Sequence, residues 1–156
     1  NYKRSGRPGD MEHSSTVRHI DLKNANLFPF GFGLSYTTYK YDAPKCAPTL
    51  DSKGNLKVKV RVTNTGDVDG EEIVQLYVAD KVASMVRPVK ELKAFKKVFI
   101  AKKQSVEVEL DVNAKDLGFY TNDMKYVVEP GEFTIMTGPN SEDLQTCSVR
   151  LNKAIE

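Results

Sequence analysis

The segment Phe28-Pro29-Phe30-Gly31-Phe32-Gly33-Leu34-Ser35-Tyr36 divides the sequence into two parts of different character. Its proline lacks a backbone donor and its two glycines allow backbone angles closed to other residues, so it is neither a helix nor a regular strand. Its three phenylalanines offset the cost of ordering it only if they are buried against apolar surface. Two interpretations stay open: a hydrophobic lead-in to the first strand, or a hinge that fastens this chain to a neighbouring domain.

Alternating patterns follow this segment to the end of the chain. The ranges 56–65 and 106–112 alternate apolar with charged or polar residues, as half-buried strands do. The range 73–79 is apolar on both faces and predicts a central strand, whereas Pro88 marks 82–89 as an edge or crossover segment. Such strands, at turn spacings of about 8–12 residues and without an amphipathic helix, predict an all-β sandwich.

Two of these strands carry opposite charges on their outward faces. Facing opposite charges are favoured between neighbouring strands, and a one-residue slip would turn the apolar side chains outward. We therefore predict that the two strands are antiparallel neighbours in one sheet. The predicted pairs are Lys57 with Asp111, Lys59 with Glu109, Arg61 with Glu107, Val58 with Leu110 and Val60 with Val108.

Residues 1–27 are polar and show neither period, which predicts an extended arm. We divide the chain into an arm and aromatic hinge, residues 1–34, and a sandwich, residues 35–156. The range 113–120 predicts a crossover with one helical turn capped by Asn113.

Composition favours an ordinary soluble domain. The 156 residues hold 23 Lys and Arg against 21 Asp and Glu, a formal charge of +2, which carries no signature for nucleic acid or an anionic membrane. No apolar run approaches the roughly 20 residues of a membrane span. Cys46 and Cys147 define no disulfide framework. A bridge between them requires neighbouring first and last strands, and their predicted places along those strands disfavour it.

The sequence offers little support for a metal-binding, catalytic or sugar-binding site. Asp67-Val68-Asp69-Gly70 resembles part of a calcium loop, but the twelfth position is Val78 within a strand, so we predict an Asp-Gly hairpin turn. His13 and His19 have no ligand spacing, so no metal or cofactor is predicted. The acidic residues fall on solvent faces or in turns, where no carboxylate pair for glycoside hydrolysis is expected. Tyr39 and Tyr41 share one strand face, but the chain has no tryptophan, which disfavours direct sugar binding.

The order of several motifs resembles one family. Residues 28–38 are similar to the opening motif of the C-terminal fibronectin type III-like domain of glycoside hydrolase family 3. Four further segments resemble that domain in order: Val62–Gly66, Glu71–Asp80, Arg87–Phe95 and Glu129–Phe133, with Ser5–Pro8 similar to the preceding linker. The chain departs from the family at Lys102-Lys103-Gln104, where a Pro-Gly turn is common.

The resemblance implies an immunoglobulin/fibronectin type III-like β-sandwich that is the non-catalytic accessory domain of a β-glucosidase-like enzyme. The parent would be a retaining enzyme with its two carboxylates upstream, and the domain's partner would be those upstream catalytic domains. The family suggests an extracellular or periplasmic location. The inter-domain contact would be Phe28, Pro29, Phe30, Gly31, Phe32 and Gly33. Two alternatives stay open: a carbohydrate-binding module and an adhesion-type interaction domain.

Overall fold

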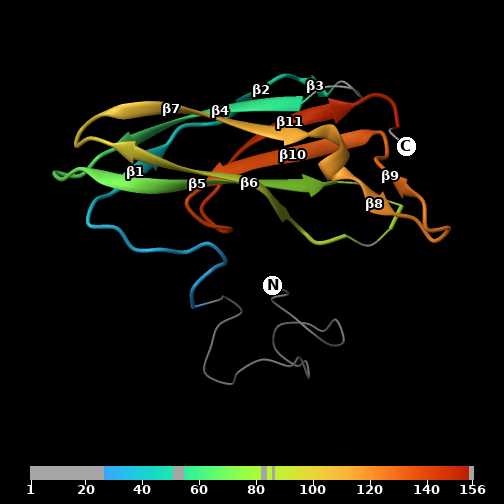
Figure 1. Cartoon of the computed structure of the whole chain (residues 1–156), viewed down its shortest axis with the longest axis horizontal. Coiled ribbons are helices and arrows are strands. Elements are labelled where there is room, and N and C mark those ends of the chain that lie inside the picture. Colours follow the sequence, from blue (N-terminus) through green and yellow to red (C-terminus); the bar gives the residue numbers. More distant parts are fainter. Residues whose placement is uncertain (1–26, 51–54, 82–83, 86, 155–156) are drawn as a thin grey trace, which may run out of the picture.

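The computed structural model describes residues 27–50, 55–81, 84–85 and 87–154. Two β-sheets pack face to face (Figure 1), so the predicted sandwich is confirmed. The first sheet has β4 between β7 on one side and two short strands on the other. Its strands are β1 (Tyr39–Tyr41), β2 (Lys45–Cys46), β4 (Asn55–Asn64) and β7 (Ser105–Asn113). The arm at residues 1–26 lies outside the described residues.

The second sheet has the order β3-β11-β10-β5-β6, antiparallel except between β3 and β11. Its strands are β3 (Thr49–Leu50), β5 (Gly70–Asp80), β6 (Glu91–Ile100), β10 (Gly131–Gly138) and β11 (Gln145–Leu151). Since β5 lies between β10 and β6, its predicted central place is confirmed. A 3-10 turn, η1 (Ala114–Leu117), and a small hairpin, β8 (Phe119–Tyr120) with β9 (Tyr126–Val127), complete the described elements. The Asn113 side chain caps η1 as predicted, accepting from Lys115 N–H at 2.9 Å.

The predicted register between β4 and β7 is confirmed at every pair. Val58 faces Leu110 and Val60 faces Val108 in the core, while Lys59 faces Glu109 outside. The ion pairs themselves are partly diagonal. Lys57 Nζ lies 2.8 Å from Glu109 Oε1 rather than on the facing Asp111. Long side chains reach the diagonal neighbour in this way, so a charged residue on this face can interact with more than one partner on the facing strand.

The predicted Asp-Gly hairpin at 67–70 is wrong, because β4 and β5 belong to different sheets. The connection crosses from one sheet to the other and is organised by the buried side chain of Asn64. Its Nδ2 donates to the carbonyls of Val68 and Ile100, at 2.9 and 3.0 Å, and its Oδ1 accepts from Gly66 N–H and the Thr37 hydroxyl. The side chain thus holds the crossing in place of the ladder hydrogen bonds of a hairpin.

A disulfide joins Cys46 and Cys147, contrary to the expectation from their places along the strands. Cys46 ends β2 in the first sheet, and three residues later the chain pairs with β11 as β3 in the second. Because the chain changes sheet directly after Cys46, this residue lies close to β11, which contains Cys147. The two Cα atoms are 6.9 Å apart. The bridge therefore connects the two sheets across a separation of 101 residues.

The remaining connections differ in detail from the predictions. Between β5 and β6 the described residues form no strand, and the two strands are antiparallel neighbours in one sheet. The segment around Pro88 is therefore a loop joining neighbouring strands, neither an edge strand nor a crossover. The turn at 101–104 replaces the family's Pro-Gly turn with Lys103 at φ 58°, closed by Gln104 N–H donating to the Ala101 carbonyl. The β8–β9 hairpin was missed, since two-residue strands leave no period in the sequence.

Candidate docking surface

The predicted contact residues 28–33, here called the hinge segment, are fastened to the second sheet through Gln75. Side chains at 74, 76 and 78 of β5 enter the core, so Gln75 and Tyr77 project from the opposite, outer face. Gln75 Nε2 donates to the carbonyls of Gly31 and Pro139, at 3.0 and 2.6 Å. The Tyr77 hydroxyl donates to its Oε1. One buried carboxamide therefore connects the hinge, β5 and the loop after β10.

The hinge backbone has a defined shape of its own. Phe32 N–H donates to the Pro29 carbonyl at 3.1 Å, and Ser141 N–H donates to the Phe30 carbonyl at 2.9 Å. Gly31 has φ 80°, and a side chain there would overlap the Gln75 carboxamide. Glycine is required at 31 both for the left-handed backbone and for the close approach. Gly33 is different, because open space surrounds the position of its missing side chain.

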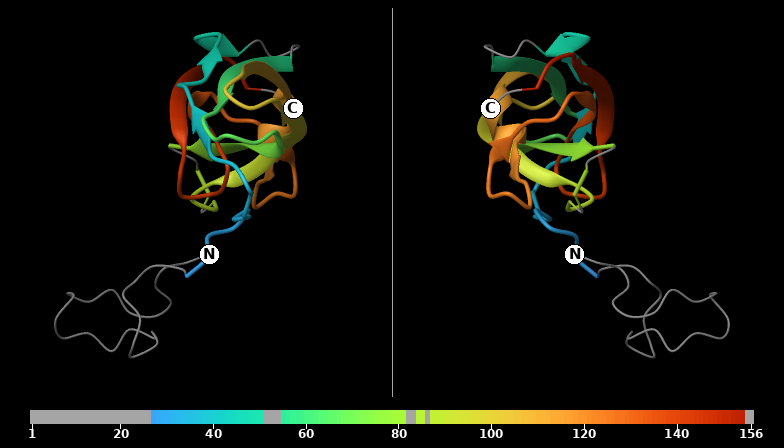
Figure 2. Two further views of the ribbon diagram at one scale, coloured as in Figure 1. Left: turned by 90° about the vertical axis from the view of Figure 1, so that its left-hand side faces the viewer. Right: turned by 90° about the vertical axis from the view of Figure 1, so that its right-hand side faces the viewer.

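The rings of this fixed backbone face outward. Phe28, Phe30 and Phe32 are 64%, 58% and 42% exposed. Phe28 and Phe32 contact each other with ring centroids 5.2 Å apart, and Phe30 meets Tyr77 edge-on at 6.4 Å. The segment is blue in Figure 1 and runs below β5, outside the body of the sandwich, as Figure 2 also shows. The rings are thus not core residues of the described domain.

A second group of apolar side chains on β5 and β6 was not predicted as a surface. Ile73, Phe95 and Phe99 are exposed on the outer face of the second sheet, with Phe95 at 69% and Phe99 at 60%. The sequence contained a signal: the range 92–100 has apolar residues on both faces, whereas a half-buried edge strand needs them on one. The residue pattern predicted this strand correctly, but it did not show that the rings of Phe95 and Phe99 face solvent.

A groove of about 360 Å³ separates the hinge segment from β1 and β5. Tyr39 and Tyr41 line it, but both pack against the core and offer no free platform. The Tyr41 hydroxyl donates to Glu72 Oε1 at 2.7 Å. Burial raises the pKa of Glu72, and burial together with this hydrogen bond raises the pKa of Tyr41. The pair is a half-buried polar contact between the sheets.

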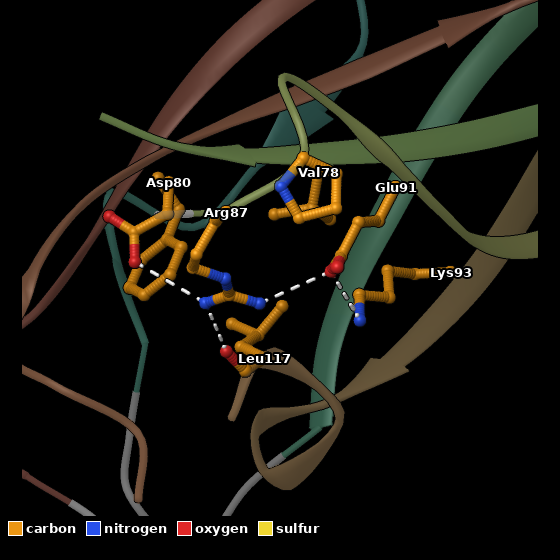
Figure 3. A pocket seen from close by; sticks show the side chains of 8 residues that line it. Val78, Asp80, Arg87, Glu91, Lys93 and Leu117 are labelled. Atoms are coloured by element: carbon orange, nitrogen blue, oxygen red, sulfur yellow. Dashed lines mark hydrogen bonds and ion pairs between the residues drawn. The ribbon is translucent and has the colours of Figure 1, made fainter. Parts of the chain in front are cut away.

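Arg87 is the centre of a further polar cluster, between the end of β5 and the start of β6 (Figure 3). Its guanidinium donates to the Leu117 carbonyl at 2.8 Å and pairs with Glu91 at 3.1 Å and Asp80 at 3.4 Å. Lys93 and Arg87 hold the pKa of Glu91 below its ordinary value against the opposing effect of burial. The space that these side chains enclose is only about 10 Å³, room for about one water. The cluster therefore fastens the loop between β5 and β6 to η1 and offers no ligand pocket.

The described residues contain no group of three or more His, Cys, Asp or Glu side chains placed to hold a metal ion. Asp67 pairs instead with Lys103 at 2.9 Å, and Asp69 Oδ1 accepts from Lys102 N–H. Within the same part of the chain, no helix is long and apolar enough to cross a membrane. The acidic residues of β7 project outward beside the lysines of β4.

The comparisons with known proteins agree with this geometry. The family model described as the fibronectin type III-like domain matches residues 72–141. The chain is 47% identical over 126 residues to a β-xylosidase from Formosa agariphila. This match covers 79% of the chain and 17% of the relative. The chain is also 38% identical over 150 residues to a periplasmic β-glucosidase from Salmonella typhimurium, covering 94% of the chain and 20% of the relative. The chain belongs to the fibronectin type III-like domains of family 3 glycoside hydrolases.

A solved structure extends the likeness to the whole fold. The crystal structure of a β-glucosidase from Listeria innocua in complex with glucose matches with a TM-score of 0.84 at 31% identity. That match covers 100% of this chain and 22% of the other. The chain thus spans about a fifth of the length of these relatives, and the family that the ordered motifs predict is confirmed.

Proposed function

We propose that this chain is a non-catalytic accessory domain that the hinge segment packs against the catalytic body of a larger family 3 glycoside hydrolase. Under this proposal the parent hydrolyses terminal β-glucosides or related bonds, as the names of the β-glucosidase and β-xylosidase relatives suggest. The observation that carries the proposal is the hinge itself. Three aromatic rings remain exposed, two of them by more than half, although hydrogen bonds hold their backbone in one place.

The free energy available from covering these rings is substantial. A phenylalanine ring buries about 200 Å² when fully enclosed. Phe30 is 58% exposed, so about 120 Å² remains to be covered, worth about 3 kcal/mol at 25 cal/mol/Å². Because the backbone is already ordered, little conformational entropy opposes this burial. The hinge is therefore suited to contact a preformed apolar surface.

The acidic residues support a structural rather than a catalytic role. Glycoside hydrolysis needs two carboxyl groups about 5 Å apart in retaining enzymes, on either side of a bound sugar. Glu109 instead accepts from Lys57 on an exposed sheet face, and this contact holds its pKa below the ordinary value. Glu91 is enclosed in the Arg87 cluster, away from any sugar-sized space. The hydrolytic carboxylates are assigned to the part of the parent upstream of this chain.

The test compares Phe30→Ala in the isolated chain and in the complete polypeptide. The proposal expects a thermal midpoint close to that of the unsubstituted chain in the first context and a clear decrease in the second. Tyr120→Ala is the matched control, since this ring is also exposed, at 63%, but lies on β8. Equal losses in both contexts would identify the ring as ordinary core, and glucan binding by the isolated chain would favour a carbohydrate-binding module.

We also propose that the parent works in an oxidising compartment, outside the cytoplasm. Disulfides persist in secreted and periplasmic proteins and are rare in the cytosol. The bridge between Cys46 and Cys147 and the periplasmic location named for one relative support this placement. Mass spectrometry of alkylated protein from fractionated host cells tests it. Free thiols at both cysteines in the native protein would contradict it.

A further inference from the structure

The outer face of β5 and β6 carries a group of exposed apolar side chains. Phe95 lies opposite Gln75 in the register, and Phe99 lies opposite Glu71. Side chains of such pairs stand about 5 Å apart on one face. Ile73 lies between Glu71 and Gln75 along β5. Ile73, Phe95 and Phe99 therefore form one group of neighbouring exposed side chains, here called the β5–β6 patch.

This patch continues into the hinge segment. Gln75 is the common neighbour, since it faces Phe95 across the strands and donates to the Gly31 carbonyl. The groove beside the hinge is lined by Phe32 on one side and Ile73 on the other. Phe30 contacts Tyr77 on the same outer face. The rings of the hinge and those of the patch thus belong to one exposed surface, of the kind that marks an interaction site.

We propose that the β5–β6 patch is a second contact of this domain with the catalytic body of its own polypeptide. The inference rests on the proposed docking through the hinge segment and extends it to a different element. The occupant is an apolar surface of the body that also carries polar groups. Polar groups are needed because Lys97 faces Ile73 within the patch and forms an ion pair with Glu71 there. A protein interface as a whole is only about as apolar as the rest of the surface, so a charged pair among the exposed rings is compatible with docking.

Two observations favour the catalytic body over a second copy of this chain. The described chain leads into the sandwich along this same face, and about four fifths of the length of the relatives lies outside the match. A tethered partner reaches the patch at high effective concentration without any gain in affinity. In addition, β6 is an edge strand bearing Lys93, Lys96 and Lys97, and edge lysines oppose pairing with another copy.

Hydroxyl-radical footprinting with mass spectrometry tests the inference on unsubstituted protein. Oxidation of Phe95 and Phe99 is compared between the isolated chain and the complete polypeptide, with Phe30 reporting on the hinge and Tyr120 as the exposed control. Rings now 69% and 60% exposed would fall to about a tenth on entering an interface core, so we expect about sixfold slower oxidation. Tyr120 should be oxidised equally in both.

Each outcome separates the two proposals. Protection of Phe30 alone, with Phe95 and Phe99 oxidised at the same rate in both proteins, overturns the inference and leaves the proposed function standing. No protection of any of the three rings overturns both. Protection of the patch in the isolated chain that increases with protein concentration identifies a second copy as the occupant and also overturns the inference. Phe95→Ser with Phe99→Ser should in addition lower the thermal midpoint of the complete polypeptide but not of the chain alone.

Discussion

Replacing Gln75 by leucine should release the hinge segment from the sandwich. The change removes two hydrogen bonds donated by Nε2 and the one accepted from Tyr77. Each is worth about 1 kcal/mol net, and the Tyr77 hydroxyl, in a residue only 2% exposed, is left without its partner at a cost of about 1–3 kcal/mol. The apolar leucine recovers part of this, so we expect a loss of about 3 kcal/mol.

Urea unfolding followed by far-ultraviolet circular dichroism measures this loss, since the chain has no tryptophan. For a domain of this size the loss corresponds to a decrease of about 10 °C in the thermal midpoint. Hydrogen exchange supplies the local measurement. The amides of Phe32 and Ser141, which donate to Pro29 and Phe30, should exchange about tenfold faster once the hinge opens locally.

Thr137→Val is the matched control on the neighbouring strand β10. The Thr137 side chain is fully buried, and among the described residues its hydroxyl has no hydrogen-bond partner. Its replacement by an apolar group of the same shape should be neutral or stabilising. A loss below about 1 kcal/mol for Gln75→Leu would refute the reasoning. So would a large loss with unchanged exchange at Phe32, because the carboxamide would then stabilise the sheet without holding the hinge.

Three further predictions concern the rest of the fold. Cys46→Ser should lower the free energy of unfolding by about 4 kcal/mol, because the bridge closes a loop of 101 residues; a reductant should reproduce the loss in denaturant titrations, and an unchanged midpoint would contradict it. In the first sheet, Val60→Ala should lower the free energy of unfolding by about 2–3 kcal/mol and Lys59→Ala by less than about 1 kcal/mol. Similar losses for the two substitutions in the same titration would mean that the charges stabilise the fold and do not only select the strand partner. Burial raises the pKa of Glu72 above 4.5, so the stability this group contributes is present below that pH and lost as pH rises through the folded-state pKa. Glu72→Gln should therefore raise the thermal midpoint at pH 7 but not at pH 4, and an equal decrease at both would mean that the carboxylate form stabilises the fold.

Much of the sandwich could be read from short-range pattern. Successive side chains of a strand point to opposite faces, so alternation at 56–65 and 106–112 decides which residues enter the core. The charges then select the partner, and the observed register agrees with that prediction at Val58, Val60 and Lys59. The cap at Asn113 was equally predictable, because a side chain that accepts from a backbone N–H two residues later is a local interaction.

The candidate docking surface was only half predictable. The hinge segment could be found because three rings, a proline and two glycines in six residues satisfy no regular structure. Whether those rings enter the domain's own core depends on where the backbone is fastened, and Gln75, more than 40 residues away, does this. The pattern predicts Phe95 and Phe99 only as strand residues, since an apolar side chain has the same strand propensity on either face.

Local sequence pattern was enough to predict the strand content, the inward face of the alternating strands, the pairing of β4 with β7 and the family. The complete fold was needed to show that 67–70 crosses between the sheets, that Cys46 reaches Cys147, and that the hinge and the β5–β6 patch form one surface. The physical reason is the range of the interactions. Side-chain direction and turn preference depend on a few neighbouring residues, whereas the sheet that a strand joins depends on contacts distant in the chain, made only when the whole core closes.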